Sequence, residues 1–316
     1  MKVDFTESMV RLRTIGKLTH SFIAPIKILP FTESLIGYGK RPTCHLLLAH
    51  LLKHKKYCDF YKDRHNEGDM IILDNGAFEF KKPIPIEEYS KYIDNLGFQP
   101  DVVVAPDYPF EPSLRTLKET ELFIKQFDKY FDSEKTKIMA VPQSTVGDWE
   151  DWLRCYRELL NNDRVSAIGM SILGVPNAFC SVTGTKDITF NRNYMTSLIK
   201  RLGIVDKSKW YHYLGCGSPR EIIDMVMHGV ADSNDSSSAV WHAVNGITFD
   251  ESATGLVNGK TPIEVDFLRG FDNLDKDEEW SLVRRISNNM YVVQKWIDDT
   301  HATIIKANGG QASLNF

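Results

Sequence analysis

Residues 101–143, DVVVAPDYPFEPSLRTLKETELFIKQFDKYFDSEKTKIMAVPQ, contain a complete strand-helix-strand unit. The short apolar runs at its two ends are typical of strands that are buried on both faces of a sheet. Between them, apolar residues recur at steps of three, four and seven, which predicts an amphipathic helix over Ser113–Phe131. The expected apolar stripe of this helix consists of Leu114, Leu117, Ile124, Phe127 and Phe131.

Similar units recur along the middle of the chain. Successive ends of candidate strands are 33, 36, 26, 46 and 20 residues apart, close to the roughly 30 residues of a βα unit, and the longest interval contains an insertion at 175–192. This pattern predicts an α/β fold with a parallel sheet, either doubly wound or closed into a barrel. No GxGxxG motif follows an early strand, which removes the main argument for a dinucleotide-binding fold. The candidate strands are Ile71–Asp74, Asp101–Asp107, Lys137–Gln143, Ala167–Ile172, Trp210–Gly215 and a weaker run before Asp235.

The composition is that of a globular protein, with 42% hydrophobic and 25% charged residues among 316. No apolar run reaches the roughly 18 residues that a membrane span needs, and the first residues lack the apolar core of a signal peptide. We therefore expect no membrane partner and a cytoplasmic location, which is the host cytoplasm if the protein is viral. The five cysteines are scattered without a CxxC pair, so we expect free thiols and no bound metal.

The net charge of -4 argues against nucleic-acid binding over the whole surface. Residues 250–280, however, contain nine acidic and three basic residues. The rest of the chain therefore has a slightly positive balance, and a local face that accepts a phosphate backbone is compatible with it.

Polar residues recur at the carboxyl ends of the candidate strands, where barrels and open α/β sheets alike build their sites. An aspartate in this position can instead be only the N-cap of the next helix. The recurrence at four strand ends favours one shared site over four separate caps. The four residues are Asp74, Asp107, Gln143 and Asp235.

These residue types suit a particular chemistry. Paired carboxylates perform acid/base and nucleophilic work at a glycosidic carbon. An aspartate with a glutamine also matches the edge of guanine, because Asp accepts from N–H groups and Gln donates to a carbonyl oxygen. Phe78, four residues after Asp74, is available to stack on such a ring. The set therefore indicates a site for a planar base on a glycosidic bond.

The same stretches resemble, in sequence order, the motifs of the tRNA-guanine transglycosylase superfamily. The most specific is YLGCGSPREIIDMVMHGVADSND at 213–235, and the shorter ones are DNGAF at 74–78, VVVAPD at 102–107, AVPQ at 140–143, AIGMS at 167–171 and NG at 245–246. The resemblance implies a (β/α)8 TIM barrel, so that a single domain over residues 1–316 accounts best for the length. It also implies an enzyme, without a cofactor, that exchanges guanine in a nucleic acid for a 7-deazaguanine base.

The resemblance further implies roles for individual residues. Asp235 is expected to be the nucleophile that forms a covalent glycosyl intermediate, and Asp74 the general acid and base. Asp232 is the alternative nucleophile, but Asp235 is preferred because small residues follow it directly. Asp107 and Gln143 are expected to read the guanine edge. The rest of the expected base pocket consists of Gly169 and Met170 through their backbone, Phe78 and Leu214 on the faces of the ring, and Gly215.

One departure bears on the polymer. The tRNA enzymes carry a zinc site of three cysteines and a histidine after the NG motif, whereas no cysteine follows Cys216 here. The chain is thus more similar to the compact, zinc-less phage and bacterial branch that modifies DNA, with preQ0 or a derivative as the free base. The alternatives are action on tRNA, a catalytically silent nucleic-acid-binding subunit, and an O-glycoside hydrolase. A homodimer or an accessory protein is compatible with each of them.

Basic residues flank the DNGAF motif. Lys81 and Lys82 follow it directly, and Lys53, Lys55 and Lys56 precede it. They suit contacts with phosphates beside a strand-end pocket. For the earlier group, the alternative is the solvated end of a helix over Cys44–Leu52, where cations suit the helix dipole.

Two histidines raise the question of a metal site. His212 and His242 occur near Cys216, but no fourth ligand is evident. A histidine inside an aromatic strand is more often a hydrogen-bonded packing residue. We therefore interpret His212 as part of the packing of its strand.

Overall fold

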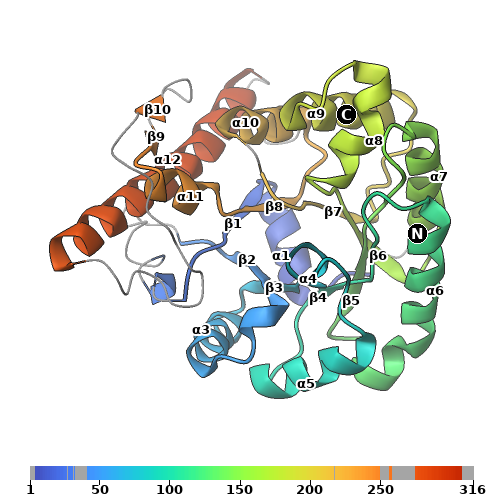
Figure 1. The fold of residues 1–316 in the computed structure, drawn as a ribbon, viewed down its shortest axis with the longest axis horizontal. Coiled ribbons are helices and arrows are strands. Elements are labelled where there is room, and N and C mark those ends of the chain that lie inside the picture. The colour runs from blue at the N-terminus through green and yellow to red at the C-terminus, as the bar shows by residue number, and fades with distance from the viewer. Residues whose placement is uncertain are drawn as a thin grey trace.

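The computed structural model describes residues 4–26, 28–30, 32, 41–216, 218–249, 256–257 and 275–307. Eight parallel strands form one sheet in the order β1-β8-β7-β6-β5-β4-β3-β2. Figure 1 shows the helices as a ring around these strands. The predicted (β/α)8 TIM barrel of parallel strands is therefore confirmed. The strands are β1 (Thr19–Phe22), β2 (Cys44–Leu47), β3 (Met70–Leu73), β4 (Val102–Val104), β5 (Lys137–Ala140), β6 (Val165–Gly169), β7 (Trp210–Tyr213) and β8 (Ser233–Ser236).

Every residue of β2 through β8 is buried. Helices cover the outer face of a barrel and side chains fill its interior. Both faces of each strand are therefore buried, which explains why most of these strands are apolar. The sequence SNDS of β8 is an exception, because a buried polar strand needs hydrogen-bond partners for each side chain. The helices are α1 (Glu7–Ile15), α3 (Lys55–Asn66), α4 (Ala77–Phe80), α5 (Ile86–Leu96), α6 (Ser113–Tyr130), α7 (Trp149–Leu160), α8 (Gly174–Thr183), α9 (Ile188–Arg201), α10 (Pro219–His228), α11 (Ser238–Val244) and α12 (Lys276–Ala307).

The barrel is nearly closed, with β1 and β2 side by side at the seam. The backbone N–H of Leu46 donates to Ser21 Oγ at 2.8 Å, so a side chain links the two edge strands. Helix α1 covers the amino end of the barrel. Its Arg13 pairs with Asp232, just before β8, and donates to the carbonyl of Lys209, just before β7. The carboxyl end is thereby the end that is left for a site.

The predicted strands are observed as β3 to β8, whereas β1 and β2 have no predicted counterpart. The predicted helix over Cys44–Leu52 is wrong, because Cys44–Leu47 forms β2 and Ala49–Leu51 forms a single 3-10 turn. A short apolar run fits a strand or a buried helix equally well. Pairing of Leu46 with Ile72 in β3 decides for the strand.

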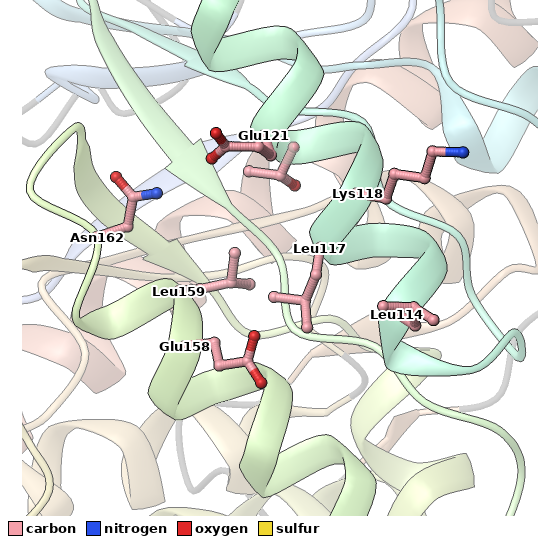
Figure 2. Close-up of a pocket in the computed structure, with 8 residues that line it drawn as sticks. Leu114, Leu117, Lys118, Glu121, Glu158, Leu159 and Asn162 are labelled. Atoms are coloured by element: carbon pink, nitrogen blue, oxygen red, sulfur yellow. The ribbon is translucent and has the colours of Figure 1, made fainter.

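The predicted stripe of α6 is wrong at its first position, since Leu114 is 70% exposed. The other predicted positions do pack inward: Phe127 and Phe131 are buried, and Leu117 and Ile124 are partly buried against the core. The helix also buries Thr116, Thr120 and Phe123. Leu114 borders a hollow of about 310 Å³ between α6 and α7 (Figure 2), outside the strand-end region.

The predicted insertion at 175–192 consists of an additional helix, α8, and the segment that leads into α9. The long helix α12 packs along α10 and α11. Most of the acidic stretch at 250–280 lies outside the described residues. None of the helices in the described ranges combines the length and apolar composition that a membrane crossing requires.

Candidate active site

The four predicted polar residues all lie at the carboxyl end of the barrel. Asp74 directly follows β3, Asp107 and Gln143 follow β4 and β5 by three residues, and Asp235 is the third residue of β8. The charges of Asp107 and Asp235 both raise the pKa of Asp74, so the three carboxylates lie close enough to interact electrostatically. The expectation that separate strands bring these residues together agrees with this geometry.

Asp107 is held by two side-chain amides. Asn75 Nδ2 donates to its Oδ1 and Gln143 Nε2 to its Oδ2, both at 2.6 Å. Burial raises the pKa of Asp107 to about 6, although these two donors act to lower it. Asn75 was not predicted, yet its amide also bonds to the carbonyl of Ala105 and so ties the β3 loop to the β4 loop.

Gln143 is fully buried and keeps one polar atom without a partner. Its Oε1 makes no hydrogen bond to any described residue. Gly174 makes room for this oxygen, since a Cβ at that position would lie 2.1 Å from it. Oε1 is therefore a buried acceptor, and the second hydrogen on Nε2 is a donor, both suited to a polar ligand.

Asp74 is shaped by burial and by other carboxylates. Its Oδ2 accepts the N–H of Gly76 at 3.0 Å. Burial, the neighbouring charge of Glu79, and the charges of Asp107 and Asp235 together raise its pKa to about 8. At neutral pH Asp74 is therefore mostly a neutral acid that has a proton to give.

Glu79 is a site residue that the sequence reasoning missed. It lies on the short helix α4, and its buried Oε2 has no hydrogen-bond partner among the described residues. Burial raises its pKa, and the charge of Asp235 adds to that rise. The only hint of its location in the sequence was its position within DNGAFEF, one residue after Phe78. A single glutamate on a helix is usually exposed to solvent, so this position alone does not indicate a site.

One oxygen of Asp235 has two hydrogen-bond partners. His212 Nε2 lies 3.0 Å from Oδ1, and the backbone N–H of Gly215 donates to the same oxygen at 2.9 Å. His212 was interpreted as a packing residue; it is fully buried, as that interpretation requires, but it also contacts the predicted nucleophile. A second unpredicted histidine, His20 of β1, bonds to Asn234 at 3.0 Å, and burial lowers its pKa to about 4.

Asp232, the alternative nucleophile, lies at the opposite end of β8. It forms an ion pair with Arg13 at 2.7 Å and accepts the N–H of Tyr211 at 2.8 Å. Both contacts belong to the closed amino end of the barrel. The geometry therefore favours Asp235 over Asp232 for a role in the site.

The loops after β6 and β7 are held together by Arg192, another residue that the sequence did not indicate. Its guanidinium donates to the carbonyls of Gly215 at 2.7 Å and Met170 at 3.1 Å, and pairs with buried Glu221 at 3.1 Å. The carbonyl of Met170 also accepts the N–H of Leu214. The backbone groups of Met170 are thus engaged within the protein, and its expected contact with a base has to come from other atoms.

Gly169 and Gly215 are positions where a side chain does not fit. A Cβ on Gly169 would lie 2.8 Å from Val141 Cγ2 and 3.0 Å from Leu214 Cδ1. Gly215 has φ +69°, and a Cβ there would lie 2.9 Å from Ile172. The two glycines let the loops that carry Leu214 and Met170 pack closely at the end of the barrel.

Phe78 and the lysines after it lie on the surface beside Asp74. The ring of Phe78 is 60% exposed, and Lys81 Nζ lies 4.9 Å from its centroid. Lys81 adopts φ 60°, a conformation that is uncommon for a residue other than glycine, and Lys82 is exposed as well. An exposed ring and two cations therefore border the carboxylates.

Lys53, Lys55 and Lys56 lie just before or within the first turn of α3. The interpretation as cations at the end of a helix is wrong, because they lie at a helix start, where the dipole disfavours them. Lys55 pairs with Asp59 on its own helix at 2.7 Å. His50, in the same loop, contacts the ring of Phe80 on α4, so this loop adjoins the segment that carries Phe78.

No set of three or more His, Cys, Asp and Glu side chains in the described ranges is arranged to hold a metal ion. Within the site, His212 bonds to Ser233 and Asp235, and Cys216 Sγ lies 3.4 Å from the carbonyl of Ser218. All five cysteines are unpaired thiols.

The arrangement as a whole offers a neutral acid, a carboxylate held by N–H donors and a polar amide pair within one buried region. Four carboxylates lie at this end, and none forms an ion pair with a described lysine or arginine. No family model matches the chain, and a search of curated proteins finds none that is similar. These comparisons therefore do not indicate a reaction.

Proposed function

We propose that the protein is a transglycosylase that exchanges guanine in DNA for a 7-deazaguanine base through a covalent bond between the sugar and Asp235. The observation that carries this proposal is the different surroundings of two carboxylates at the same end of the barrel. Asp74 keeps a proton, with its pKa raised to about 8 by burial and neighbouring acids, while Asp235 accepts the backbone N–H of Gly215 and lies 3.0 Å from His212 Nε2. A proton donor and an anionic nucleophile are what displacement at a glycosidic carbon needs.

In the proposed first step, a carboxylate oxygen of Asp235 attacks C1′ and the bond from C1′ to the base nitrogen breaks. The proton of Asp74 goes to the departing guanine, so that the base leaves neutral. In the second step, the Asp74 carboxylate takes a proton from the incoming base, whose nitrogen attacks C1′ and releases Asp235. Each aspartate thus returns to its starting state, and the exchange needs no other reactant.

Asp107 and Gln143 are proposed to bind the base. The free acceptor Oε1 of Gln143 suits an N–H donor of guanine, and its remaining amide hydrogen suits the carbonyl oxygen. Asp107, with both oxygens already bound by amides, orients Gln143 as well as reading the base itself. A 7-deazaguanine has the same edge, so one pocket accepts both the leaving and the entering base.

DNA is the polymer that we propose, with tRNA as the alternative. The absence from the sequence of the cysteines that form the zinc site of the tRNA enzymes supports DNA. The exposed ring of Phe78 beside Lys81 and Lys82 suits an extruded nucleotide, because stacking and phosphate contacts bind a single strand without reading its sequence.

The test is incubation of the protein with labelled guanine or labelled preQ0 and, in separate reactions, single-stranded DNA, duplex DNA or tRNA. The proposal predicts label in DNA, and more in a single strand than in a duplex. Label in tRNA alone would reassign the polymer. Release of guanine without incorporation would favour a hydrolase, and binding without either reaction would favour a silent subunit.

A further inference from the structure

We infer that His212 is the positioning residue of the nucleophile: its Nε2–H holds Oδ1 of Asp235, and Oδ2 is the oxygen that attacks C1′. This inference rests on the proposed function and adds two things to it, the identity of the attacking oxygen and a residue that controls it.

The tautomer of His212 follows from its neighbours. Ser233 Oγ lies 2.7 Å from both Trp210 Nε1 and His212 Nδ1. An indole N–H only donates, so Ser233 accepts from Trp210. If Ser233 also accepted from Nδ1, its buried hydroxyl proton would have no acceptor in the described ranges. We therefore infer that this hydroxyl donates to Nδ1. With Nδ1 as acceptor, the imidazole proton lies on Nε2, 3.0 Å from Asp235 Oδ1.

The two oxygens of Asp235 are therefore not equivalent. Oδ1 receives Nε2–H of His212 and the backbone N–H of Gly215. Oδ2 makes no hydrogen bond to any residue that the structure describes, and the side chain keeps 6% of its surface exposed. A carboxylate that is anchored through one oxygen presents the lone pairs of the other, and this fixes the line of attack.

The same hydrogen bonds act when the intermediate breaks down. Once Oδ2 has bonded to C1′, Oδ1 is the carbonyl oxygen of an ester. When the incoming base attacks and the bond between Oδ2 and C1′ breaks, negative charge returns to the carboxylate. Preorganised donors that face developing charge lower the barrier to that step, as in an oxyanion hole. Loss of Nε2–H should therefore slow breakdown of the intermediate more than its formation.

A matched pair of variants separates the hydrogen bond from packing. In His212→Gln, the side-chain amide nitrogen reaches about the position of Nε2 and still donates to Asp235. In His212→Asn, the shorter amide faces Ser233 and the donor to Asp235 is lost. Single-turnover reactions with a labelled oligonucleotide should show breakdown of the intermediate slowed roughly 100-fold in His212→Asn, with the intermediate accumulating, and largely restored in His212→Gln. Equal impairment of both variants, or none in either, would overturn the inference.

A measurement on the unaltered protein avoids any folding defect of the variants. Nitrogen-15 NMR of labelled histidine should show His212 protonated at Nε2 and unprotonated at Nδ1 at neutral pH. The opposite tautomer would refute the positioning role even if base exchange is observed. Absence of base exchange in the unaltered protein would instead refute the proposed function, whatever tautomer His212 adopts.

Discussion

The two ends of the barrel carry the same residue type in opposite surroundings. Three strands have an aspartate at or near each end, and the two members of each pair are separated only by the length of a strand. The amino-end aspartates are bonded to groups that include arginines, whereas at the carboxyl end the charges of two aspartates raise the pKa of the third, Asp74. The pairs, amino end first, are Asp69 and Asp74 for β3, Asp101 and Asp107 for β4, and Asp232 and Asp235 for β8.

At the amino end each of the three aspartates has cations or hydrogen-bond donors as partners, although burial still raises the pKa of Asp232 against the effect of Arg13. Arg41 and His45 bind Asp69, and their hydrogen bonds outweigh burial and hold its pKa below the ordinary value. Asp101 accepts the hydroxyl of Thr6 at 2.8 Å and the N–H of Ile71 at the same distance. Such compensation is typical of groups that hold a fold together.

At the carboxyl end the pKa values of Asp74, Glu79 and Asp107 are all raised, in each case first by burial. Burying acids without a paired lysine or arginine costs folding free energy, and strongly shifted pKa values are found most often at functional sites. This difference favours a structural role for the aspartates at the amino end and the proposed chemistry for those at the carboxyl end, the division that is found in barrel enzymes.

The largest expected difference is between the two aspartates of β8. Asp235→Asn should lower base exchange by at least about 1,000-fold, because the nucleophile is removed. Asp232→Asn should leave the rate per folded molecule within a few-fold, but weaken the pair with Arg13 and lower the free energy of unfolding by about 1 to 2 kcal/mol, since both side chains are partly exposed. Rates and urea unfolding curves of both variants test this, and the reverse pattern would move the site to the amino end.

The aspartates of β3 should differ in how stability depends on pH. The pKa of Asp74 is about 8 in the folded protein, against 3.8 ordinarily, so between these values the folded state keeps a proton that the unfolded chain has lost. Stability therefore falls as pH rises through this range. Asp74→Asn removes the penalty and should be more stable than the unaltered protein by about 1 to 2 kcal/mol at pH 8, with the gain vanishing near pH 4.

Base exchange by Asp74→Asn should fall by roughly 100- to 10,000-fold. Asp69→Asn is the control. The pKa of Asp69 is lowered in the folded protein, so its carboxylate contributes stability at pH values above its ordinary pKa of 3.8. This variant should therefore be destabilised at neutral pH and match the unaltered protein in strong acid. Normal turnover by Asp74→Asn would refute its acid/base role, and equal pH profiles for the two variants would refute the contrast between the ends.

A smaller effect is expected at Gly174, which makes room for Gln143. In Gly174→Ala the new Cβ would meet Oε1 of Gln143, so this side chain has to shift and its bond to Asp107 weakens. The KM for the free base should rise roughly 10-fold, about 1.4 kcal/mol of binding, with a smaller change in kcat. Gly184→Ala is the control for an added methyl group that meets no other atom within 4 Å; because Gly184 has φ +72°, this variant should lose some stability but keep the KM unchanged. An unchanged KM in Gly174→Ala would argue against Gln143 as a reader of the base.

The smallest effect is expected at the rim. Lys81→Ala combined with Lys82→Ala should weaken DNA binding a few-fold and reduce the slope of log affinity against log salt by roughly 1 to 2. Lys125→Ala combined with Lys129→Ala, on the outer helix α6, should leave the slope unchanged. Salt titrations monitored by fluorescence anisotropy measure the slopes of both double variants. Equal slopes would show that Lys81 and Lys82 do not contact the phosphates.

An α/β fold with a parallel sheet was predictable, because apolar strands and amphipathic helices alternate at regular intervals along the sequence. The strand-helix-strand unit predicted for residues 101–143 agrees with β4, α6 and β5, whereas closure of the sheet into a barrel was expected from the family resemblance. The strand over Cys44–Leu47 was not predictable, since its apolar run acquires its identity only from pairing with β3. Leu114 was misassigned because spacing alone does not show which face of a helix meets the barrel.

The candidate site was predictable where a polar residue ends an apolar strand, as for Asp74 and Asp107. It was not where the partner is distant in sequence: Arg192 and His212 act on loops and strands whose approach only the closed barrel creates. The one available signal for His212 was a polar residue within the buried run WYHYL, which has to be hydrogen-bonded wherever its strand lies.

The most direct test of the account is to trap the covalent intermediate. The protein is incubated with a guanine-containing oligonucleotide without free base, denatured, digested, and analysed by mass spectrometry for a nucleotide-bearing peptide. We expect the adduct on Asp235, its loss in Asp235→Asn and its persistence in Asp232→Asn. An adduct on another residue, or guanine exchange in Asp235→Asn at the unaltered rate, would contradict it.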